Sequence, residues 1–428
     1  MNKIFLSLIY FSLVSLVVGI FTSITFSSLS HILLLIAYVY LFYVYFTSVS
    51  SSTSTLISDL KTVITVLLSK SALMILLMVL VIVISVLTNL KVIAHPMGNI
   101  LSAKYFLLAI FAYYAYSILF NSKFNNIFNS NDFLSGKKLK ILLYIFFIAT
   151  TIAAISGLIA LYSGFNPIKM KQACHPIRTC GLYGMYMTYG YGMQFFCLFL
   201  VGIAIYREEI EQFLKRNINT IFLWSVIIIN MLAFILSFAR GALLGFFVAL
   251  PFMFFYKSKK IFALLIIIPM VLFIFSYVAS DKVKGLFTEH ARVKSNETRV
   301  SQMYAAIEVF KENPWFGIGY KNFESQSGKI KERLKLQHPE FIGHAHNNFF
   351  EALASTGACG FLILLLFHIF WFIESIKRRD VVGNITWPII IALFVSGQFQ
   401  YTMGDGENMF FIMNLWSLSQ IQISKFRA

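Results

Sequence analysis

Residues 221–256 read IFLWSVIIINMLAFILSFARGALLGFFVALPFMFFY, and Arg240 is the one charged residue in this stretch. A helix rises about 1.5 Å per residue, so these roughly 36 residues reach about 54 Å. Two crossings of a hydrocarbon core about 30 Å thick need slightly more than that length. The stretch therefore predicts two membrane-spanning helices joined by a tight turn, with Arg240 and Gly241 at its tip.

The whole chain has the composition of a membrane protein. Its 428 residues are 58% hydrophobic and 12% charged, with a mean hydropathy of +0.77, whereas soluble domains carry about 25% charged residues. This composition excludes a large water-soluble enzyme, a disordered chain and, with four cysteines, a disulfide scaffold. The apolar runs are also too long, and alternate too little, for the strands of a membrane barrel. The expected fold class is an all-α polytopic membrane protein.

The hydropathy pattern predicts about twelve transmembrane helices and one large hydrophilic loop. We expect helices 1–9 within residues 1–280, a loop subdomain over residues 281–346, and helices 10–12 within residues 347–428, all as one integrated membrane domain. The expected spans are 4–29, 31–48, 71–90, 103–120, 141–163, 183–206, 219–239, 241–256, 261–280, 347–375, 384–402 and 408–423.

Positive charges are distributed unequally between the two sets of loops. Of the 35 Lys and Arg residues, eighteen fall in the termini and loops of one side, and six in the short loops of the other. Because cytoplasmic loops carry the excess of Lys and Arg, both termini are predicted to be cytoplasmic and segment 281–346 to lie outside. That segment has eleven basic and eight acidic residues. The net charge of +17 therefore reflects orientation, and nucleic acid is not an expected partner.

The outside segment is expected to contain short amphipathic helices. The first opens at Thr298-Arg299, with Thr298 or Asn296 as its cap, and ends before Pro314. A second short helix is expected from Ser325 to Leu336. The apolar positions of the first helix follow helical spacing at Val300, Met303, Tyr304, Ile307 and Phe310.

Two cysteines lie close together in a predicted outside loop. Cys174 and Cys180 flank five residues that include Arg178. An oxidising exterior permits a disulfide between them, and the alternative is a pair of free thiols.

Arg240 is the most informative single residue for function. A cation within an apolar membrane stretch is costly and usually functional. Its natural partner is an anion bound from outside. The alternative is an arginine that reaches up to the lipid head groups.

His344 and His346 stand two residues apart, just before the tenth predicted helix. Such a pair can bind zinc, but no third ligand with suitable spacing is nearby. The alternative is a neutral histidine that acts as a general base near pH 7. Asn347 and Glu351 then either orient the base, bind the substrate, or cap the helix.

Taken in order, these residues resemble the O-antigen ligase and O-antigen polymerase superfamily of bacterial glycosyltransferases. The similarity extends over about residues 175–375, whereas the first five spans resemble the family in hydropathy alone. The motifs that carry it are Ser237-Phe238-Ala239-Arg240-Gly241, Thr298-Arg299, Asn313-Pro314-Trp315-Phe316-Gly317-Ile318-Gly319, His344-Ala345-His346-Asn347-Asn348 with Glu351, and Gly357-Ala358-Cys359-Gly360.

The resemblance implies a function and a location. The ligases of this family move a glycan from undecaprenyl diphosphate to a sugar of lipid A–core, on the periplasmic face of the inner membrane. The implied partners are therefore that lipid-linked donor, the lipid A–core acceptor and membrane lipids. No metal and no cofactor are implied. The protein is expected to be a multi-pass inner-membrane enzyme whose active site faces the periplasm.

The resemblance also assigns roles to individual residues. The essential arginines of the family match Arg240 and Arg299, and its essential histidine matches the HxHN element. His346 is preferred over His344 as the base because it directly precedes Asn347. The remaining positions expected to bind substrate are Arg178, His344, Asn347 and Glu351.

Three alternatives remain. A polymerase of the same superfamily uses the same donor but joins lipid-linked repeats, and the amphipathic helix and terminal HxHN of the outside segment favour the ligase. A protein O-oligosaccharyltransferase would have a serine or threonine acceptor. A transporter of lipid-linked glycans would place polar residues near the bilayer midplane in repeated halves, whereas here they gather on the outer side.

Overall fold

The computed structural model describes residues 2–48, 68–120, 136–279 and 290–421, which are mainly helical. A short antiparallel pair of strands, β1 (Phe165–Asn166) and β2 (Lys171–Gln172), lies between the helix that ends at Ser163 and the helix that begins at Tyr186. The helices are α1 (Asn2–Thr22), α2 (Ile24–Ser48), α4 (Lys70–Thr88), α5 (Pro96–Leu101), α6 (Lys104–Phe120), α8 (Gly136–Ser163), α9 (Tyr186–Ile205), α10 (Arg207–Leu214), α11 (Thr220–Ile235), α12 (Arg240–Ala249), the 3₁₀ helix η2 (Leu250–Phe254), α13 (Lys259–Ala279), α15 (His290–Glu312), α16 (Phe323–Arg333), α17 (Asn348–Arg378), α18 (Val381–Ser396) and α19 (Gly406–Ser419).

This architecture confirms an all-α fold with apolar helices of membrane length. Within the described residues, five helical segments are long and apolar enough to cross a membrane. They are Lys70–Thr88, Pro96–Ser117, Gly136–Ser163, Tyr186–Ile205 and Asn348–Arg378. Every one of the twelve expected spans overlaps a helix, but the count of twelve crossings stays a prediction.

The first turn of the chain does not lie where the hydropathy places it. The expected break near residue 30 is wrong, because α1 ends at Thr22 and α2 begins at Ile24. The two helices then fold back on each other, and Ser15 Oγ donates to the carbonyl oxygen of Phe26 at 2.6 Å. Hydropathy cannot detect such a turn, since both sides of it are apolar.

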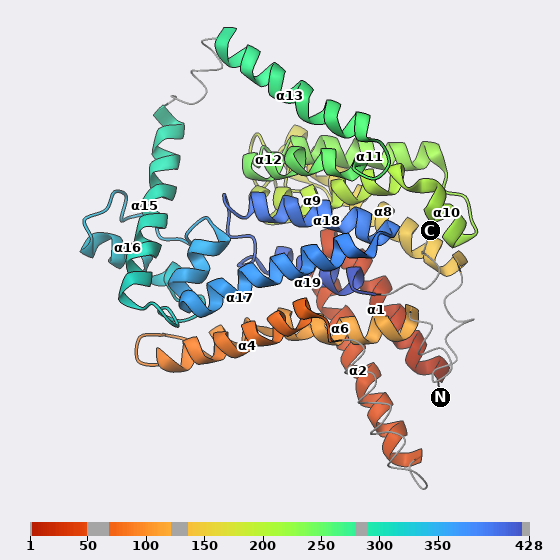
Figure 1. Ribbon diagram of the computed structural model, residues 1–428, viewed down its shortest axis with the longest axis horizontal. Coiled ribbons are helices and arrows are strands. Elements are labelled where there is room, and N and C mark those ends of the chain that lie inside the picture. Colours follow the sequence, from red (N-terminus) through yellow and green to blue (C-terminus); the bar gives the residue numbers. More distant parts are fainter. Residues whose placement is uncertain (1, 49–67, 121–135, 280–289, 422–428) are drawn as a thin grey trace.

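The long helices run side by side in one bundle, with α9 near its middle (Figure 1). α9 packs against α11, α12, α18 and α19, and α17 packs against α4 and α18. The buried side chains of this bundle form one large apolar cluster. α13 packs against η2 and extends away from the bundle (Figure 1).

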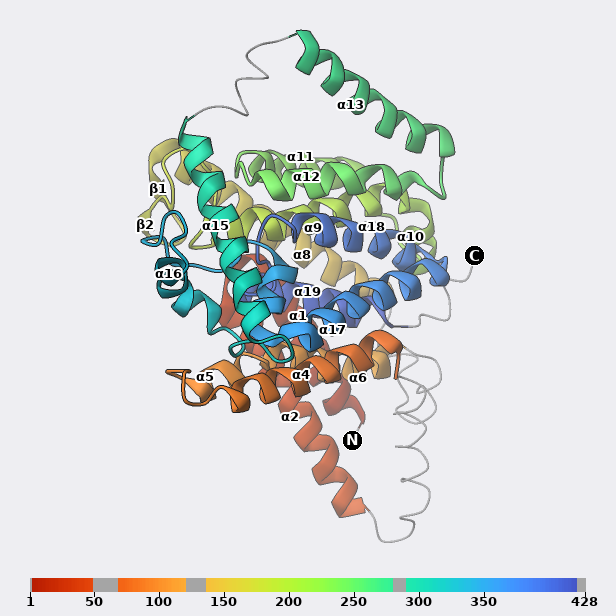
Figure 2. The same ribbon diagram turned by 60° about the vertical axis from the view of Figure 1, so that its left-hand side comes forward.

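α15 and α16 form a small unit at one end of the bundle (Figure 2). Their buried side chains make a second apolar cluster, with Ala345 and Ala354 contributed from the chain that leads into and along α17. α15 begins at His290, whereas the sequence expectation starts it at Thr298 with Thr298 or Asn296 as the cap. Those two residues lie inside the helix, because the polar segment before them continues the helical turns. The expected residues 281–289 of this loop lie outside the described part of the chain.

α17 is interrupted at Gly357. Gly357 adopts φ 67° and ψ −164° inside the helix. The freed backbone groups bond to the segment that follows α15, since Ile318 N donates to Ala354 O at 3.0 Å and Ala358 N donates to Pro314 O at 2.7 Å. Two motifs that are some forty residues apart in the sequence thus meet at this break.

Candidate functional site

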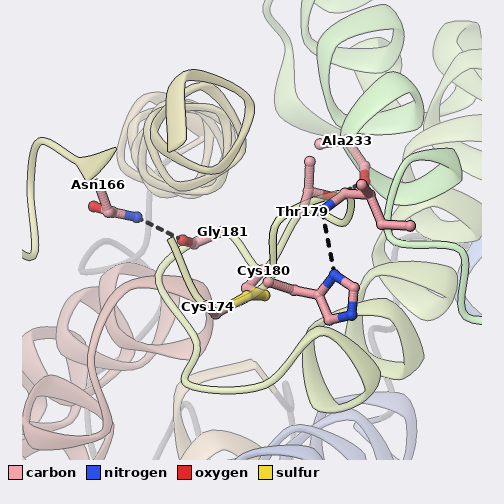
Figure 3. The surroundings of a disulfide bond; sticks show 8 residues. Asn166, Cys174, Thr179, Cys180, Gly181 and Ala233 are labelled. Carbon is pink, nitrogen blue, oxygen red and sulfur yellow. Dashed lines mark hydrogen bonds between the residues drawn. A yellow bond between two sulfur atoms is a disulfide. The ribbon is translucent and has the colours of Figure 1, made fainter. Parts of the chain in front are cut away.

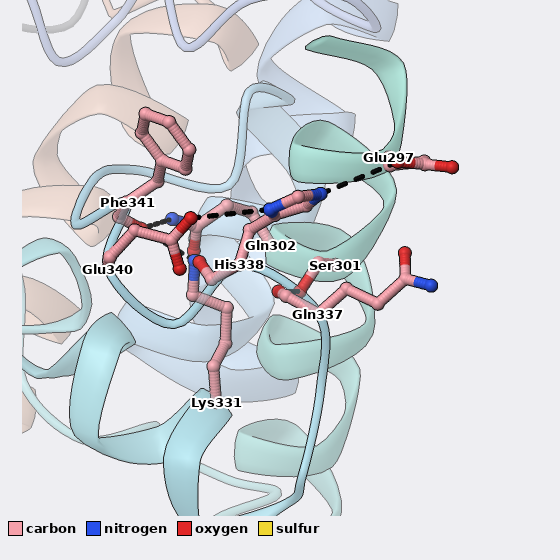
Figure 4. Close-up of polar contacts among 8 residues, drawn as sticks. All are labelled: Glu297, Ser301, Gln302, Lys331, Gln337, His338, Glu340 and Phe341. Atoms are coloured by element: carbon pink, nitrogen blue, oxygen red, sulfur yellow. Dashed lines mark hydrogen bonds and ion pairs between the residues drawn. The ribbon is translucent and has the colours of Figure 1, made fainter. Parts of the chain in front are cut away.

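The chain that leads into the two histidines is fastened to the outer helices (Figure 4). The buried Lys331 of α16 donates from Nζ to the carbonyl oxygens of His338 at 2.7 Å and Phe341 at 2.6 Å. On α15, Gln302 Nε2 donates to the same Phe341 oxygen at 2.9 Å, and Ser301 Oγ donates to the Gln337 carbonyl at 2.6 Å. Residues 337–343 are therefore fixed against the helix that carries Arg299.

Ala345 separates the two histidines in the chain. Ala345 is fully buried in the small cluster between α15, α16 and α17. The flanking His344 and His346 are half-buried, and their rings lie against each other. His346 itself adopts φ 51°, a left-handed conformation that few residues other than glycine adopt and that persists only where neighbouring contacts hold it.

The two imidazoles are held against each other and against one carboxamide. Their ring centroids lie 4.4 Å apart, and His344 Nδ1 lies 3.1 Å from the peptide nitrogen of His346. Gln400 Oε1 lies 3.1 Å from His346 Nδ1, and Gln400 Nε2 lies 3.2 Å from His344 Nε2. The ring of Tyr401 packs edge-on against His344 at 5.8 Å.

Asn347 is the cap of α17. Its Oδ1 accepts from the peptide N–H groups of Phe349 at 2.8 Å and Phe350 at 3.1 Å. Its Nδ2 donates to the backbone oxygen and to Oε1 of Gln398, at 3.2 and 3.1 Å. These four hydrogen bonds use both acceptor positions and both donor positions of the Asn347 carboxamide. The structure shows the capping role of Asn347, and its contact with substrate stays a prediction.

Glu351 is buried beneath the histidine segment. It is 1% exposed, and its carboxylate accepts from the peptide N–H of Ala345 at 2.8 Å and from Ser355 Oγ at 2.9 Å. A side chain in this place holds the backbone between the two histidines. A direct contact of Glu351 with substrate stays a prediction.

Two of the expected arginines act on the same part of the site. The charge of Arg299 on α15 acts on both His344 and His346. The charges of Arg299 and of Arg240, the first residue of α12, both act on the hydroxyl of Tyr191. Arg240, Arg299 and the two histidines are therefore brought within electrostatic range of one region, although they come from three separate segments.

The Arg240 turn is pressed against α9. A Cβ atom at Gly241 would overlap the Tyr191 hydroxyl, and one at Gly190 would lie 2.7 Å from Ser237 Oγ. Glycine at both positions allows the turn to approach α9 closely. The tight turn lies close to where the sequence predicts it, but Arg240 and Gly241 are not at its tip: α12 begins at Arg240, directly after a turn in which Phe238 has φ 50°.

Arg178 lies in a loop that a disulfide closes. Cys174 and Cys180 are joined (Figure 3), which settles the choice that the sequence leaves open. The guanidinium carbon of Arg178 lies 4.2 Å from the ring centroid of Tyr186 at the start of α9. The buried Nε of Arg178 has no hydrogen-bond partner among the described residues.

The same loop is bonded to the end of α11. Thr179 N donates to the Leu236 carbonyl at 3.0 Å, and Thr179 Oγ1 donates to the Ala233 carbonyl at 2.6 Å. Figure 3 shows Thr179 between the disulfide and Ala233. Because Leu236 opens the turn that ends at Arg240, the Arg178 loop and the Arg240 turn adjoin.

Both histidines are neutral near pH 7. Burial, together with the neighbouring His346 and Arg299, lowers the pKa of His344 to about 3. Burial also lowers the pKa of His346 to about 4, with Arg299 and Lys331 acting in the same direction and Gln400 opposing them. A neutral imidazole keeps a lone pair that can accept a proton, although its low pKa makes it a weaker base than a histidine that titrates near pH 7.

No metal centre is assembled from the described part of the chain. Among those residues, no group of three or more His, Cys, Asp and Glu side chains comes together in a way that would hold a metal ion. Metal independence stays a prediction that a chelator tests.

Sequence reasoning missed two residues of this site. Tyr191 lies on α9 within range of the charges of Arg240 and Arg299, and Gln400 lies in the loop between α18 and α19. Neither belongs to a recognisable motif. The one available signal for Tyr191 is the pair of glycines around it in Gly190-Tyr191-Gly192.

Comparison with known families gives a match to part of the chain. Residues 225–365 match the family model described as O-antigen ligase. No curated protein matches the chain. The matched segment includes Arg240, Arg299 and His346, and it ends before Gln400.

Proposed function

Because residues 225–365 place this chain in the O-antigen ligase family, we propose that it moves an O-antigen glycan from undecaprenyl diphosphate to a sugar hydroxyl of lipid A–core. The observation that carries the proposal is the convergence of Arg299 and Arg240 on one region beside two neutral histidines. Such a site combines fixed cations with a proton acceptor. Those are the two requirements of transfer from a lipid diphosphate.

The arginines serve the leaving group. As the bond between the sugar C1 and the diphosphate oxygen breaks, negative charge develops on that oxygen. Fixed cations at this point lower the barrier, and a guanidinium pairs with two phosphate oxygens at once and stays charged. We assign this role to Arg240 and Arg299. Arg178, whose Nε is buried and whose loop adjoins the Arg240 turn, is assigned to binding the diphosphate.

His346 serves the acceptor. The acceptor hydroxyl attacks C1 from the side opposite the leaving group, its proton passes to His346, and undecaprenyl diphosphate departs with the electrons of the broken bond. This course inverts the configuration at C1. General-base catalysis of this kind contributes about 10²–10⁴-fold to the rate. His344 packs on His346 and is assigned to the same binding site.

Asn347 and Glu351 are assigned to positioning. Asn347 starts α17 directly after the base, and Glu351 holds the peptide N–H of Ala345. Both act on the conformation of the histidine segment. Neither is assigned a contact with the sugar.

The proposed setting is the bacterial inner membrane. The end of the bundle with α15 and α16 would face the periplasm, and both termini would face the cytoplasm. Figures 1 and 2 support this arrangement, because α15 and α16 lie together at one end of the bundle and α10 lies at the other. The partners would be the lipid-linked donor, the lipid A–core acceptor and membrane lipids.

Transfer by the purified protein tests the proposal. The full chain in detergent is given an undecaprenyl-diphosphate glycan with lipid A–core and, in a separate reaction, with lipid-linked repeats alone. Glycan on lipid A–core supports the ligase, and lengthening of the lipid-linked chains supports the polymerase of the same family. Absence of any transfer, in a preparation that binds the donor, would contradict both.

A further inference from the structure

Gln400 lies between the two histidines although it belongs to a different part of the chain. It is 3% exposed and lies in the loop that joins α18 to α19. One end of its carboxamide contacts His346 Nδ1 at 3.1 Å, and the other contacts His344 Nε2 at 3.2 Å. It is thus a buried polar group with both ends on the ring nitrogens of the site.

The loop around Gln400 is held from both sides. On one side, Asn347 Nδ2 donates to the Gln398 carbonyl at 3.2 Å. On the other, Asn348 Nδ2 donates to Thr402 Oγ1 at 2.9 Å. The two asparagines that follow the base therefore fix the backbone on each side of Gln400, and its carboxamide has little freedom to leave the imidazoles.

A carboxamide has one accepting end and one donating end. The two ring nitrogens that it contacts must therefore be in opposite protonation states. The carboxamide thus couples the two rings, because the protonation of the nitrogen at one end sets the protonation of the nitrogen at the other. Which nitrogen of a histidine is basic is set in this way by the hydrogen bond at the other nitrogen.

We propose that Gln400 is the positioning residue of the base: its carboxamide bridges Nδ1 of His346 and Nε2 of His344, holds the two rings in place, and stabilises the imidazolium that forms as the acceptor loses its proton. The inference rests on the proposed transferase function. The peptide N–H of His346 also donates to His344 Nδ1 at 3.1 Å, so His344 is held at both of its ring nitrogens.

The other groups around His346 do not share this role. Arg299 on α15 and Lys331 on α16 are cations that disfavour a charged imidazole, as burial does. Glu351 on α17 is bonded to Ala345 and to Ser355, beneath the segment. Among these neighbours, Gln400 is the one that raises the pKa of His346.

Two variants of Gln400, one to glutamate and one to methionine, test the positioning role. In Gln400→Glu, a carboxylate accepts from His346 Nδ1, and an opposite charge at such a distance raises a pKa by about 1–3 units. The acid limb of the pH–kcat profile should therefore move up by at least about one unit. Gln400→Met should lower kcat about 10²-fold with KM for the donor unchanged, since the general-base contribution is largely lost.

Gln398→Glu is the matched control for charge. It adds a carboxylate two residues away in the same loop, keeps an acceptor for Asn347, and has no contact with either ring. Its acid limb should stay with that of the unmodified protein. Thermal unfolding in detergent and donor binding are measured for each variant, so that loss of folding is separated from loss of positioning.

Three outcomes would overturn the inference. The acid limb of Gln400→Glu coincides with that of Gln398→Glu; or Gln400→Met retains full kcat; or His344→Asn is inactive while His346→Asn transfers, which would make His344 the base. The proposed function fails by a different result, namely no transfer by the unmodified protein. The two failures are therefore distinguishable.

Discussion

The Glu351 carboxylate accepts a hydrogen bond from the peptide N–H of Ala345, with 2.8 Å between Oε2 and the nitrogen. This one contact fixes the backbone between the two histidines, and both partners are buried. It joins the first turn of α17 to the segment that precedes the helix. A positioning role for Glu351, in place of a contact with substrate, has a clear experimental consequence.

Glu351→Gln should keep most of the transfer activity, and Glu351→Ala should lose it. A glutamine offers an oxygen to Ala345 and retains a polar contact to Ser355, whereas alanine leaves a buried N–H without an acceptor at a cost of about 1–3 kcal/mol. Initial rates and thermal unfolding of the two variants check this. If both variants are folded and equally inactive, Glu351 contacts the substrate directly instead of positioning the histidine segment.

Arg240→Ala and Arg299→Ala should each lower kcat by about 10²–10³-fold, as loss of a group that stabilises developing negative charge does. Arg240→Lys should recover part of that loss, because lysine keeps the charge without the bidentate fork. Arg333→Ala is the matched control, since Arg333 pairs with Glu312 on the surface of the same outer unit at 2.7 Å. Near-normal transfer by Arg240→Ala would show that Arg240 does not stabilise the diphosphate leaving group.

Activity should persist to low pH. The pKa of His344 is lowered to about 3 and that of His346 to about 4, against about 6.5 for an unperturbed histidine. In the free protein the base therefore stays unprotonated as the pH falls from 7 to 5, and the acid limb of kcat/KM, which reports the free protein, lies below pH 5. A limb between pH 6 and 7, measured over a range in which the protein stays folded, would contradict the burial of His346.

The same shifts predict a loss of stability in acid. The pKa values are lower in the folded chain than in the unfolded chain, so the unfolded state binds more protons below about pH 6.5. The stability due to the neutral histidines is complete above that pH and falls as the pH drops toward 4. The midpoint of thermal unfolding should decrease over this range, and less steeply in a His344→Asn, His346→Asn double variant.

The disulfide between Cys174 and Cys180 should protect two of the four thiols from labelling. In denaturant without reductant, alkylation should modify two cysteines, and after reduction four. Opening so short a loop releases about 2 kcal/mol of chain constraint. The Cys174→Ser, Cys180→Ser variant should therefore bind the donor more weakly, with a raised KM, because the loop carries Arg178. An unchanged KM would separate Arg178 from donor binding.

Gly357→Ala should destabilise the outer unit. Gly357 has φ 67°, and a Cβ there would overlap the backbone carbonyl of Trp315. A strained backbone of this kind costs about 1–3 kcal/mol. Gly184→Ala is the control, because a Cβ at Gly184 meets nothing within 4 Å. If the two variants unfold at the same temperature, the break in α17 does not depend on glycine.

Much of the helical fold follows from the sequence, because long apolar runs and the polar residues between them have local causes. The turn before Arg240 and the cap at Asn347 also have local causes, since each is determined by a few adjacent residues. The turn at Ser23 is not, because it interrupts an apolar run without any change in polarity. The break at Gly357 is also hidden, since its hydrogen-bond partners come from residues 314–318.

The site is less predictable than the fold for a related reason. The arginines and histidines stand out because their chemistry is unusual in their surroundings. Gln400 and Tyr191 do not stand out, since each gains its place through a partner far away in the sequence. Periodicity and motif spacing report on neighbours along the chain, and these contacts join separate segments.

The contacts of Gln400 also determine when, during synthesis of the chain, the site becomes complete. A chain emerges from the ribosome from its first residue onward, so Arg240, Arg299 and His346 are all made before α18 and the loop after it. A chain that stopped after α17 would contain every catalytic residue proposed here and would lack both Gln400 and the loop partners of Asn347 and Asn348. The nascent protein would therefore stay inactive until the loop beyond α18 is in place, and premature release would yield an inert membrane protein.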